Sequence, residues 1–291
     1  MIFVQLLVNS LIIGSIYALV ASGFSLIYST NKFMHFAHGV MVAVSAYLLF
    51  LTFDLLHISF WISCILTLIG AAILGLGTYR LLYLPLQNRK SSNVILLIAS
   101  VGILILFENL LLLIFGADIK TIGFISVSKG MEFAGVIITP LQAIIILTSI
   151  IIFIALWLFM NYTKLGRNMR AVSDNKELAN IIGINHRAVA DLSFILGSVL
   201  AGIAGILIGL EQNLAPTMGM NLIIKGFTGA IIGGITSVPG SVIGSYILGI
   251  AENYGIWWLP SEYKDAIAFV LLFIFLLFKP NGLFGKKGGR T

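Results

Sequence analysis

The sequence predicts an all-α fold, a polytopic bundle of membrane helices with about eight membrane segments. The chain is 59% hydrophobic and only 10% charged, with a mean hydropathy of +1.08, whereas soluble domains carry about 25% charged residues. Several apolar runs reach the roughly 20 residues that a helix needs to cross the hydrocarbon core. The runs are continuously apolar and lack the alternation of barrel strands, so helices are the structure that satisfies their backbone.

Eight apolar runs define the expected segments, and the first is predicted to be a retained helix. Because that run has no basic flank and is too long for a cleaved signal peptide, it stays in the mature protein. Cys64 is the only cysteine, which excludes a disulfide within the chain, and its apolar neighbours indicate a small packed hydrophobe. The runs lie at about 2–29, 36–53, 59–79, 94–115, 136–160, 189–210, 222–254 and 263–278.

The charge distribution predicts the orientation. If the polar segment 161–191 is cytoplasmic, thirteen of the seventeen Lys and Arg residues fall on that side, including Lys32 and those of the C-terminal tail. This bias follows the positive-inside rule, which also explains the net charge of +6 without a nucleic-acid partner. Residues 29–39 interrupt the first two runs, and they form either a short cytoplasmic turn or a dip that would reverse the side of the N-terminus. Lys120, Lys129, Lys225 and Lys264 are then expected on the outside.

The run 222–254 must enter and leave the membrane on one side for this orientation to hold. It is too short for two full spans, which need about 40 residues, and it contains the sequence GGITSVPG. We therefore expect a re-entrant pair or two half-helices. Broken backbone at membrane depth is tolerated only under protein or beside a water-filled cavity, so Gly233, Gly234, Pro239 and Gly240 are predicted near a transport path. The outer segment 116–138 is expected to form a small hairpin.

The polar segment 161–191 contains the pattern of a short, capped helix. Asp174 and Glu177 have capping-box spacing, and Gly183 stands where a helix would stop. Leu178, Ile181 and Ile182 form one apolar face. Because two turns of helix are marginal alone in water, this face needs a partner. The partner is either the protein's own bundle or a groove on a soluble subunit.

Two acidic residues lie in or beside apolar runs and are candidates for the transport path. A carboxylate at Glu108 or Glu252 would suit the ammonium group of an amino acid, although either residue can instead pair with an Asn, the backbone or a neighbouring helix. His35 and His38 are three residues apart and are expected to share a helical face. A metal site would need further ligands, so hydrogen bonding at a helix end or packing at a gate is favoured and no metal is predicted.

Three segments together resemble a known family. The spacing Glu177-x-Ala179-x-x-x-Gly183 resembles the "EAA" loop of ABC importer permeases, whose short coupling helix sits in a cleft of the ATPase subunit. Residues 18–39, 166–209 and 227–252 are similar to the permeases of branched-chain amino acid importers, especially the shorter of their two permease subunits. The literal triplet is absent, since residues 176–179 read KELA.

The resemblance implies one transmembrane permease domain, 1–291, with a cytoplasmic coupling loop at 161–191. It assigns contact with the ATPase to Asp174, Glu177, Leu178, Ala179, Ile181, Ile182 and Gly183, and places Asn31, Lys32 and His38 near the gate. The implied partners are ABC ATPase subunits, a second permease subunit and an extracytoplasmic solute-binding protein, within the lipid of a bacterial inner membrane. The coupling loop and the C-terminus would be cytoplasmic.

The sequence lacks the phosphate-binding loop G-x-x-x-x-G-K-[ST], so ATP would be bound by a partner, and neither a cofactor nor an enzymatic activity is expected. The implied cargo is leucine, isoleucine and valine. Urea, short amides and other amino acids are the alternatives within the same superfamily. A gradient-driven transporter or channel is a second class, and a membrane enzyme is a third.

Overall fold

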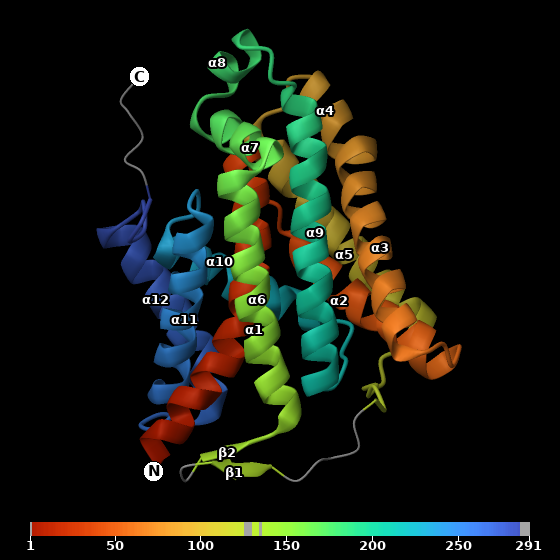
Figure 1. Cartoon of the computed structure of the whole chain (residues 1–291), viewed down its shortest axis with the longest axis vertical. Helices are drawn as coiled ribbons and strands as arrows, with labels where there is room; N and C mark the ends of the chain where they lie inside the picture. The colour runs from red at the N-terminus through yellow and green to blue at the C-terminus, as the bar shows by residue number, and fades with distance from the viewer. Residues whose placement is uncertain (1, 125–129, 134–135, 286–291) are drawn as a thin grey trace.

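The protein is a helical bundle whose long helices run roughly parallel, as the computed structural model of residues 2–124, 130–133 and 136–285 shows (Figure 1). This confirms the predicted fold class. The helices are α1 (Ile2–Asn31), α2 (Ala37–Phe50), α3 (Phe60–Thr78), α4 (Leu84–Asn88), α5 (Asn93–Phe115), α6 (Pro140–Tyr162), α7 (Lys164–Asp174), α8 (Lys176–Ile181), α9 (His186–Glu211), α10 (Met218–Gly233), α11 (Val238–Gly255) and α12 (Lys264–Phe278). Two π-helical turns, η1 (Leu51–Leu55) and η2 (Tyr79–Tyr83), and the 3₁₀ turn η3 (Ser261–Tyr263) complete the helical elements of the described residues.

The bundle has two distinct ends. One carries α4, α7 and α8 and is called the α8 end; the other carries the N-terminus and the strands β1 (Met131–Phe133) and β2 (Val136–Ile138) and is called the hairpin end (Figure 1). The strands pair antiparallel, as expected for the segment 116–138. Gln5 fixes them to α1, because its side chain donates to Ile137 O at 3.0 Å and accepts from Ile137 N at 2.9 Å.

The membrane segments correspond to the eight apolar runs. Within the described residues, six continuous helical stretches are long and apolar enough to cross a membrane, and α10 and α11 form a pair bent by 114°. The eighth is α12, which has 15 residues and is therefore only about 22 Å long at 1.5 Å per residue. The chain is thus a multi-pass membrane protein.

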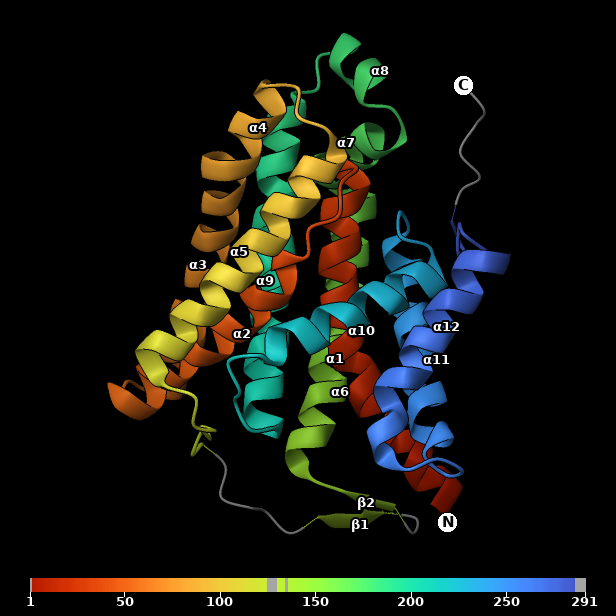
Figure 2. The same ribbon diagram turned by 180° about the vertical axis from the view of Figure 1, so that it is seen from behind.

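The first two helices are joined by a segment that turns back into the bundle. α1 ends at the α8 end, where the Lys32 ammonium donates to Ser173 O at 2.7 Å. Residues 32–36 then lead inward, so that α2 begins inside the bundle (Figure 2). The N-terminus therefore lies at the hairpin end and Lys32 at the α8 end, as the charge distribution predicts.

The bent pair leaves and returns at the hairpin end. Before α10, Leu214 exchanges two backbone hydrogen bonds with Lys120, at 2.8 and 3.1 Å, beyond the hairpin end of α5. After α11 turns back, the Tyr254 hydroxyl donates to Phe3 O at 2.9 Å, near the start of α1. The predicted re-entrant geometry of 222–254 is confirmed.

Glycine allows α2 and α10 to pack closely where they cross inside the bundle. A Cβ added to Gly39 of α2 would lie 2.3 Å from Gly219 O of α10, so only hydrogen fits at this crossing. Helices α3, α5, α6 and α12 instead present large apolar side chains outward, such as Leu113, which is 83% exposed. These outer helices form the lipid-facing surface, because a soluble protein would not expose so much contiguous apolar area.

Candidate functional site

α8 is a short helix whose N-cap is Asn175. The Asn175 side-chain oxygen accepts hydrogen bonds from Glu177 N at 2.9 Å and from Leu178 N at 3.0 Å. The expectation that Asp174 caps this helix is wrong by one residue, because α7 continues through Asp174. Adjacent Asp and Asn both suit an N-cap, so the sequence alone favours neither. The predicted stop is confirmed: Gly183 has a φ of 85°, which favours glycine.

The apolar face of α8 is uncovered. Leu178, Ile181 and Ile182 are 60%, 78% and 71% exposed, while Ala179 is buried against the protein. Packing of this face on the protein's own bundle, one of the two predicted explanations, is therefore excluded. The helix projects beyond the ends of the long helices (Figure 1). It presents three large aliphatic side chains at the position expected for contact with a soluble protein.

α7 connects α8 to the interior of the bundle. Its cap is Thr163, whose hydroxyl accepts from Gly166 N at 3.0 Å, and its Met169 and Val172 side chains are buried. Lys32 bonds to the last turn of α7, as described above. Burial lowers the pKa of the Lys32 ammonium, while the charge of Asp174 opposes that shift. The predicted gate residue Asn31, the last residue of α1, donates to Ser193 Oγ of α9 at 3.0 Å. The end of α1 and the turn after it therefore contact both neighbours of α8.

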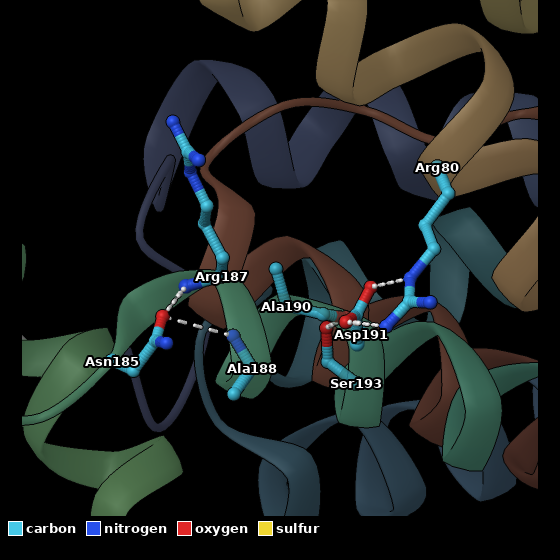
Figure 3. A network of polar contacts seen from close by, with 7 residues as sticks. All are labelled: Arg80, Asn185, Arg187, Ala188, Ala190, Asp191 and Ser193. Atoms are coloured by element: carbon cyan, nitrogen blue, oxygen red, sulfur yellow. Dashed lines mark hydrogen bonds and ion pairs between the residues drawn. The ribbon is translucent and has the colours of Figure 1, made fainter.

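The start of α9 is bound to the turn η2 and to α4. Asn185 caps α9 by accepting from Arg187 N and Ala188 N at 3.0 and 3.3 Å (Figure 3). The Arg80 guanidinium binds both carboxylate oxygens of Asp191, at 3.1 and 2.7 Å, a geometry that fixes orientation as well as distance. Arg187 also donates to Asn88 of α4 at 3.2 Å.

These bonds, here called the clasp, join the first turns of α9 to η2 and to α4. The sequence alone did not single out Arg80 or Asp191. Their pairing has no local sequence signal, because they are 111 residues apart.

The two predicted histidines lie on the segment that re-enters the bundle. His35 precedes α2 and His38 lies in its first turn, so they do not share one helical face as expected. Both side chains are fully buried. His35 Nδ1 and the Tyr83 hydroxyl are 2.8 Å apart, and Ala37 N donates to Ser100 Oγ at 3.0 Å. These bonds hold the start of α2 against η2 and α5.

Glu252 belongs to a buried ionic cluster. The Lys225 ammonium contacts the Glu252 carboxylate and lies 2.8 Å from Asp265 Oδ1, while the Tyr17 hydroxyl donates to Glu252 Oε2 at 3.0 Å. Lys225 is 5% exposed and Glu252 is 1% exposed. The cluster joins α1, α10, α11 and α12. Lys225, which the charge distribution placed among the outer cations, is therefore buried between helices, and its position inside an apolar run was the available signal that it needs a partner.

The predicted transport-path residues do not converge on one cavity of the described chain. Glu108 is half-buried on α5, and Glu252 lies in the ionic cluster. The glycines at 233, 234 and 240 fill close contacts, since a Cβ on Gly233 would lie 1.8 Å from Gly240 O. Pro239 lines a groove of about 820 Å³ between α6, α7 and α11. A role for these residues in transport stays a prediction.

Comparison with known proteins identifies the family. Residues 6–276 match the family described as "Branched-chain amino acid transport system / permease component". The chain belongs to this family. Similar proteins include the high-affinity branched-chain amino acid transport system permease protein BraD of Pseudomonas aeruginosa, 33% identical over 98% of this chain and 96% of the relative. The permease protein LivH of Escherichia coli is 32% identical over the same shares.

The permease also resembles an archaeal protein and a solved structure. A probable branched-chain amino acid transport permease protein LivH of Methanocaldococcus jannaschii is 30% identical over 97% of this chain and 92% of the relative. The structure described as PsaBC from Streptococcus pneumoniae in complex with Fab matches with a TM-score of 0.51. It covers 95% of the permease and 92% of the matched chain at 15% identity, a likeness that concerns the fold alone.

Proposed function

We propose that the permease is the membrane subunit of an ABC importer that carries leucine, isoleucine and valine into the cytoplasm, powered by ATP hydrolysis on a separate ATPase subunit. The observation that carries this proposal is the exposed aliphatic face of α8. Family membership supports the transport function, and the names of the relatives supply the cargo. Those names specify branched-chain amino acids as the transported solutes of the relatives.

The orientation follows from charge. The α8 end carries Lys32, Arg80, Arg187 and the cations of α7, and such ends face the cytoplasm under the positive-inside rule. The hairpin end then faces outward, where an extracytoplasmic solute-binding protein would deliver the solute. A second permease subunit would complete the path, because the predicted path residues of this single chain do not enclose one.

The coupling steps use contacts described above. An ATPase groove binds the aliphatic face of α8 by helix-in-groove recognition, and closure of the ATPase dimer displaces α8. The clasp between Arg80 and Asp191 passes that displacement to α9 and η2, while the Lys32 bond passes it to the turn before α2. The turn η2 and the turn before α2 therefore each lie within one or two contacts of α8.

The coupling role is tested by placing charge on α8. The double variant Ile181→Asp/Ile182→Asp should reduce ATP-driven uptake in proteoliposomes and capture of the ATPase at least about tenfold, since hot-spot side chains each contribute more than 1 kcal/mol. Both side chains are exposed, so folding should be unaffected. Ile119→Asp at the hairpin end, where the side chain is 66% exposed, is the matched control and should retain uptake.

Two results would contradict the proposal. Normal uptake by the α8 variant would remove the coupling role, and uptake in vesicles without any ATPase subunit would favour a gradient-driven transporter or channel. The cargo is tested separately, by identifying the small molecule that co-purifies with the assembled importer and its binding protein. Urea, a short amide or another amino acid in place of leucine, isoleucine or valine would overturn the cargo while leaving the coupling intact.

A further inference from the structure

The groove that Pro239 lines has a polar end and an apolar end. At the α8 end its wall includes the cations Lys32 and Arg170 together with the Asp174 carboxylate. Toward the membrane interior its wall includes Phe153 and Trp157 of α6 and Val242 and Ile243 of α11. The groove is therefore amphipathic along its length, with a net positive charge at the polar end.

The polar end offers more hydrogen-bond donors than the protein uses. Within the described residues, Lys32 donates one bond, to Ser173 O at 2.7 Å, and Arg170 donates one, to Asn161 Oδ1 at 2.8 Å. An ammonium carries three donors and a guanidinium five. The N-terminus of α11 adds a partial positive charge, because Ser237 caps this 18-residue helix at the groove wall. These donors suit a singly charged phosphate ester.

The depth of the groove corresponds to the level of lipid headgroups. Trp157 stands five residues before the end of α6, about 8 Å along the helix axis. It packs edge-on against Tyr162 with ring centroids 5.9 Å apart. Tryptophan and tyrosine concentrate at the boundary between hydrocarbon and headgroups. The cations beyond Trp157 therefore lie at headgroup level.

The apolar end opens toward lipid. Ile154 on α6 and Ile243 on α11 line the groove and are 55% and 44% exposed, and α6 and α11 also expose Leu147 and Ile250 away from it. An acyl chain lying between these helices would contact apolar side chains on both sides. We propose that the groove between α6, α7 and α11 binds one anionic glycerophospholipid, with its phosphate at Lys32 and Arg170 and an acyl chain between α6 and α11. Basic pockets between membrane helices bind anionic headgroups in this manner.

Such a lipid would link α7 and the turn after α1 to α11, close to α8. Its headgroup would contact α7 and the turn after α1, and its chain would contact α11. The bound lipid is thus placed to respond when α7 moves. The inference depends only on the groove and the membrane, so it holds whichever solute is transported.

The test uses the full chain in a neutral detergent, exposed to equal amounts of phosphatidylglycerol and phosphatidylcholine with identical acyl chains. Native mass spectrometry should show one retained phosphatidylglycerol in preference to phosphatidylcholine. Lys32→Gln/Arg170→Gln should lower phosphatidylglycerol retention about 25-fold, because each cation near a membrane surface contributes about a fivefold gain. Arg167→Gln is the matched control on the same helix, since Arg167 donates to Tyr162 O and lies outside the groove lining.

A second pair of variants leaves the cations intact. Ile243→Trp should block the apolar end and reduce retention, whereas Ile250→Trp, two turns away on the same face of α11, should not. Equal retention of both lipids by the wild type would overturn the proposal, as would equal losses in the double variant and Arg167→Gln. Unchanged phosphatidylglycerol retention together with loss of a second permease subunit in Ile243→Trp would also overturn it, by assigning the groove to protein.

Discussion

The buried cluster around Lys225 predicts a large loss of stability when one charge is removed and a recovery when its partner charge is removed as well. Glu252→Gln keeps the size of the side chain but leaves the Lys225 ammonium, which is 5% exposed, without its buried counter-ion. Breaking a buried ion pair at one partner costs about 3–5 kcal/mol. Asp265 still lies 2.8 Å from Lys225, but its side chain is 63% exposed and therefore compensates weakly. We expect a loss of about 2–4 kcal/mol in the free energy of unfolding.

Thermal unfolding in detergent, followed by circular dichroism, measures this loss. A destabilisation of 1 kcal/mol lowers Tm by about 2–4 °C in proteins of 150–250 residues, so Glu252→Gln should melt about 4–16 °C below the wild type. The double variant Lys225→Met/Glu252→Gln removes both charges and should recover to within about 1 kcal/mol of the wild type. Glu108→Gln makes the same chemical change at a half-buried position on α5. It should change the free energy of unfolding by less than about 0.5 kcal/mol.

The reasoning would be refuted by a Glu252→Gln protein that melts with the wild type. It would also be refuted by a double variant that is less stable than Glu252→Gln. The first result would mean that the pair is not desolvated, and the second that the cluster acts through shape and hydrogen bonds, with no contribution from paired charge.

Three further predictions concern helix ends and packing. Asn175→Ala should destabilise α8 by about 1 kcal/mol and speed amide exchange in its first turn, whereas Asn175→Asp should retain the cap and the slow exchange. Gly39→Ala should lower Tm, because the added Cβ would lie 2.3 Å from Gly219 O, while Gly77→Ala, with no atom within 4 Å, should match or exceed the wild type by up to about 1 kcal/mol. Asp191→Asn should lower stability by no more than about 1 kcal/mol, because the Arg80 side of the pair is 58% exposed, but it should lower uptake per ATP hydrolysed; equal coupling ratios would show that the clasp transmits nothing.

Composition and local pattern predicted the elements of this fold well. Continuous apolar runs located the membrane segments, and the GGITSVPG sequence located the bend between α10 and α11. Gly183 marked the end of α8 because a positive φ has a strong residue preference. These features depend on a few neighbouring residues, which is why one sequence suffices.

Features that depend on which helices are neighbours were not predictable. The helices are apolar on all sides, so periodicity does not show which face is buried. Glu252 was recognised as unusual, but its partner Lys225 lies on another helix. The groove is formed by side chains from α1, α6, α7 and α11, and its wall becomes visible only when these helices are placed together.

The π-helical turn η2 sets the direction in which the side chains on either side of it point. A π turn holds one residue more than the α-helical turn it replaces, and each residue of an α-helix rotates the following side chains by about 100°. Tyr79 and Tyr83 both pack against Phe194, with ring centroids 4.9 and 5.5 Å away. Deleting one residue between them would swing Tyr83 off both Phe194 and His35. A single-residue deletion across residues 79–83 should therefore remove the hydrogen bond between Tyr83 and His35 and release the start of α2 from η2.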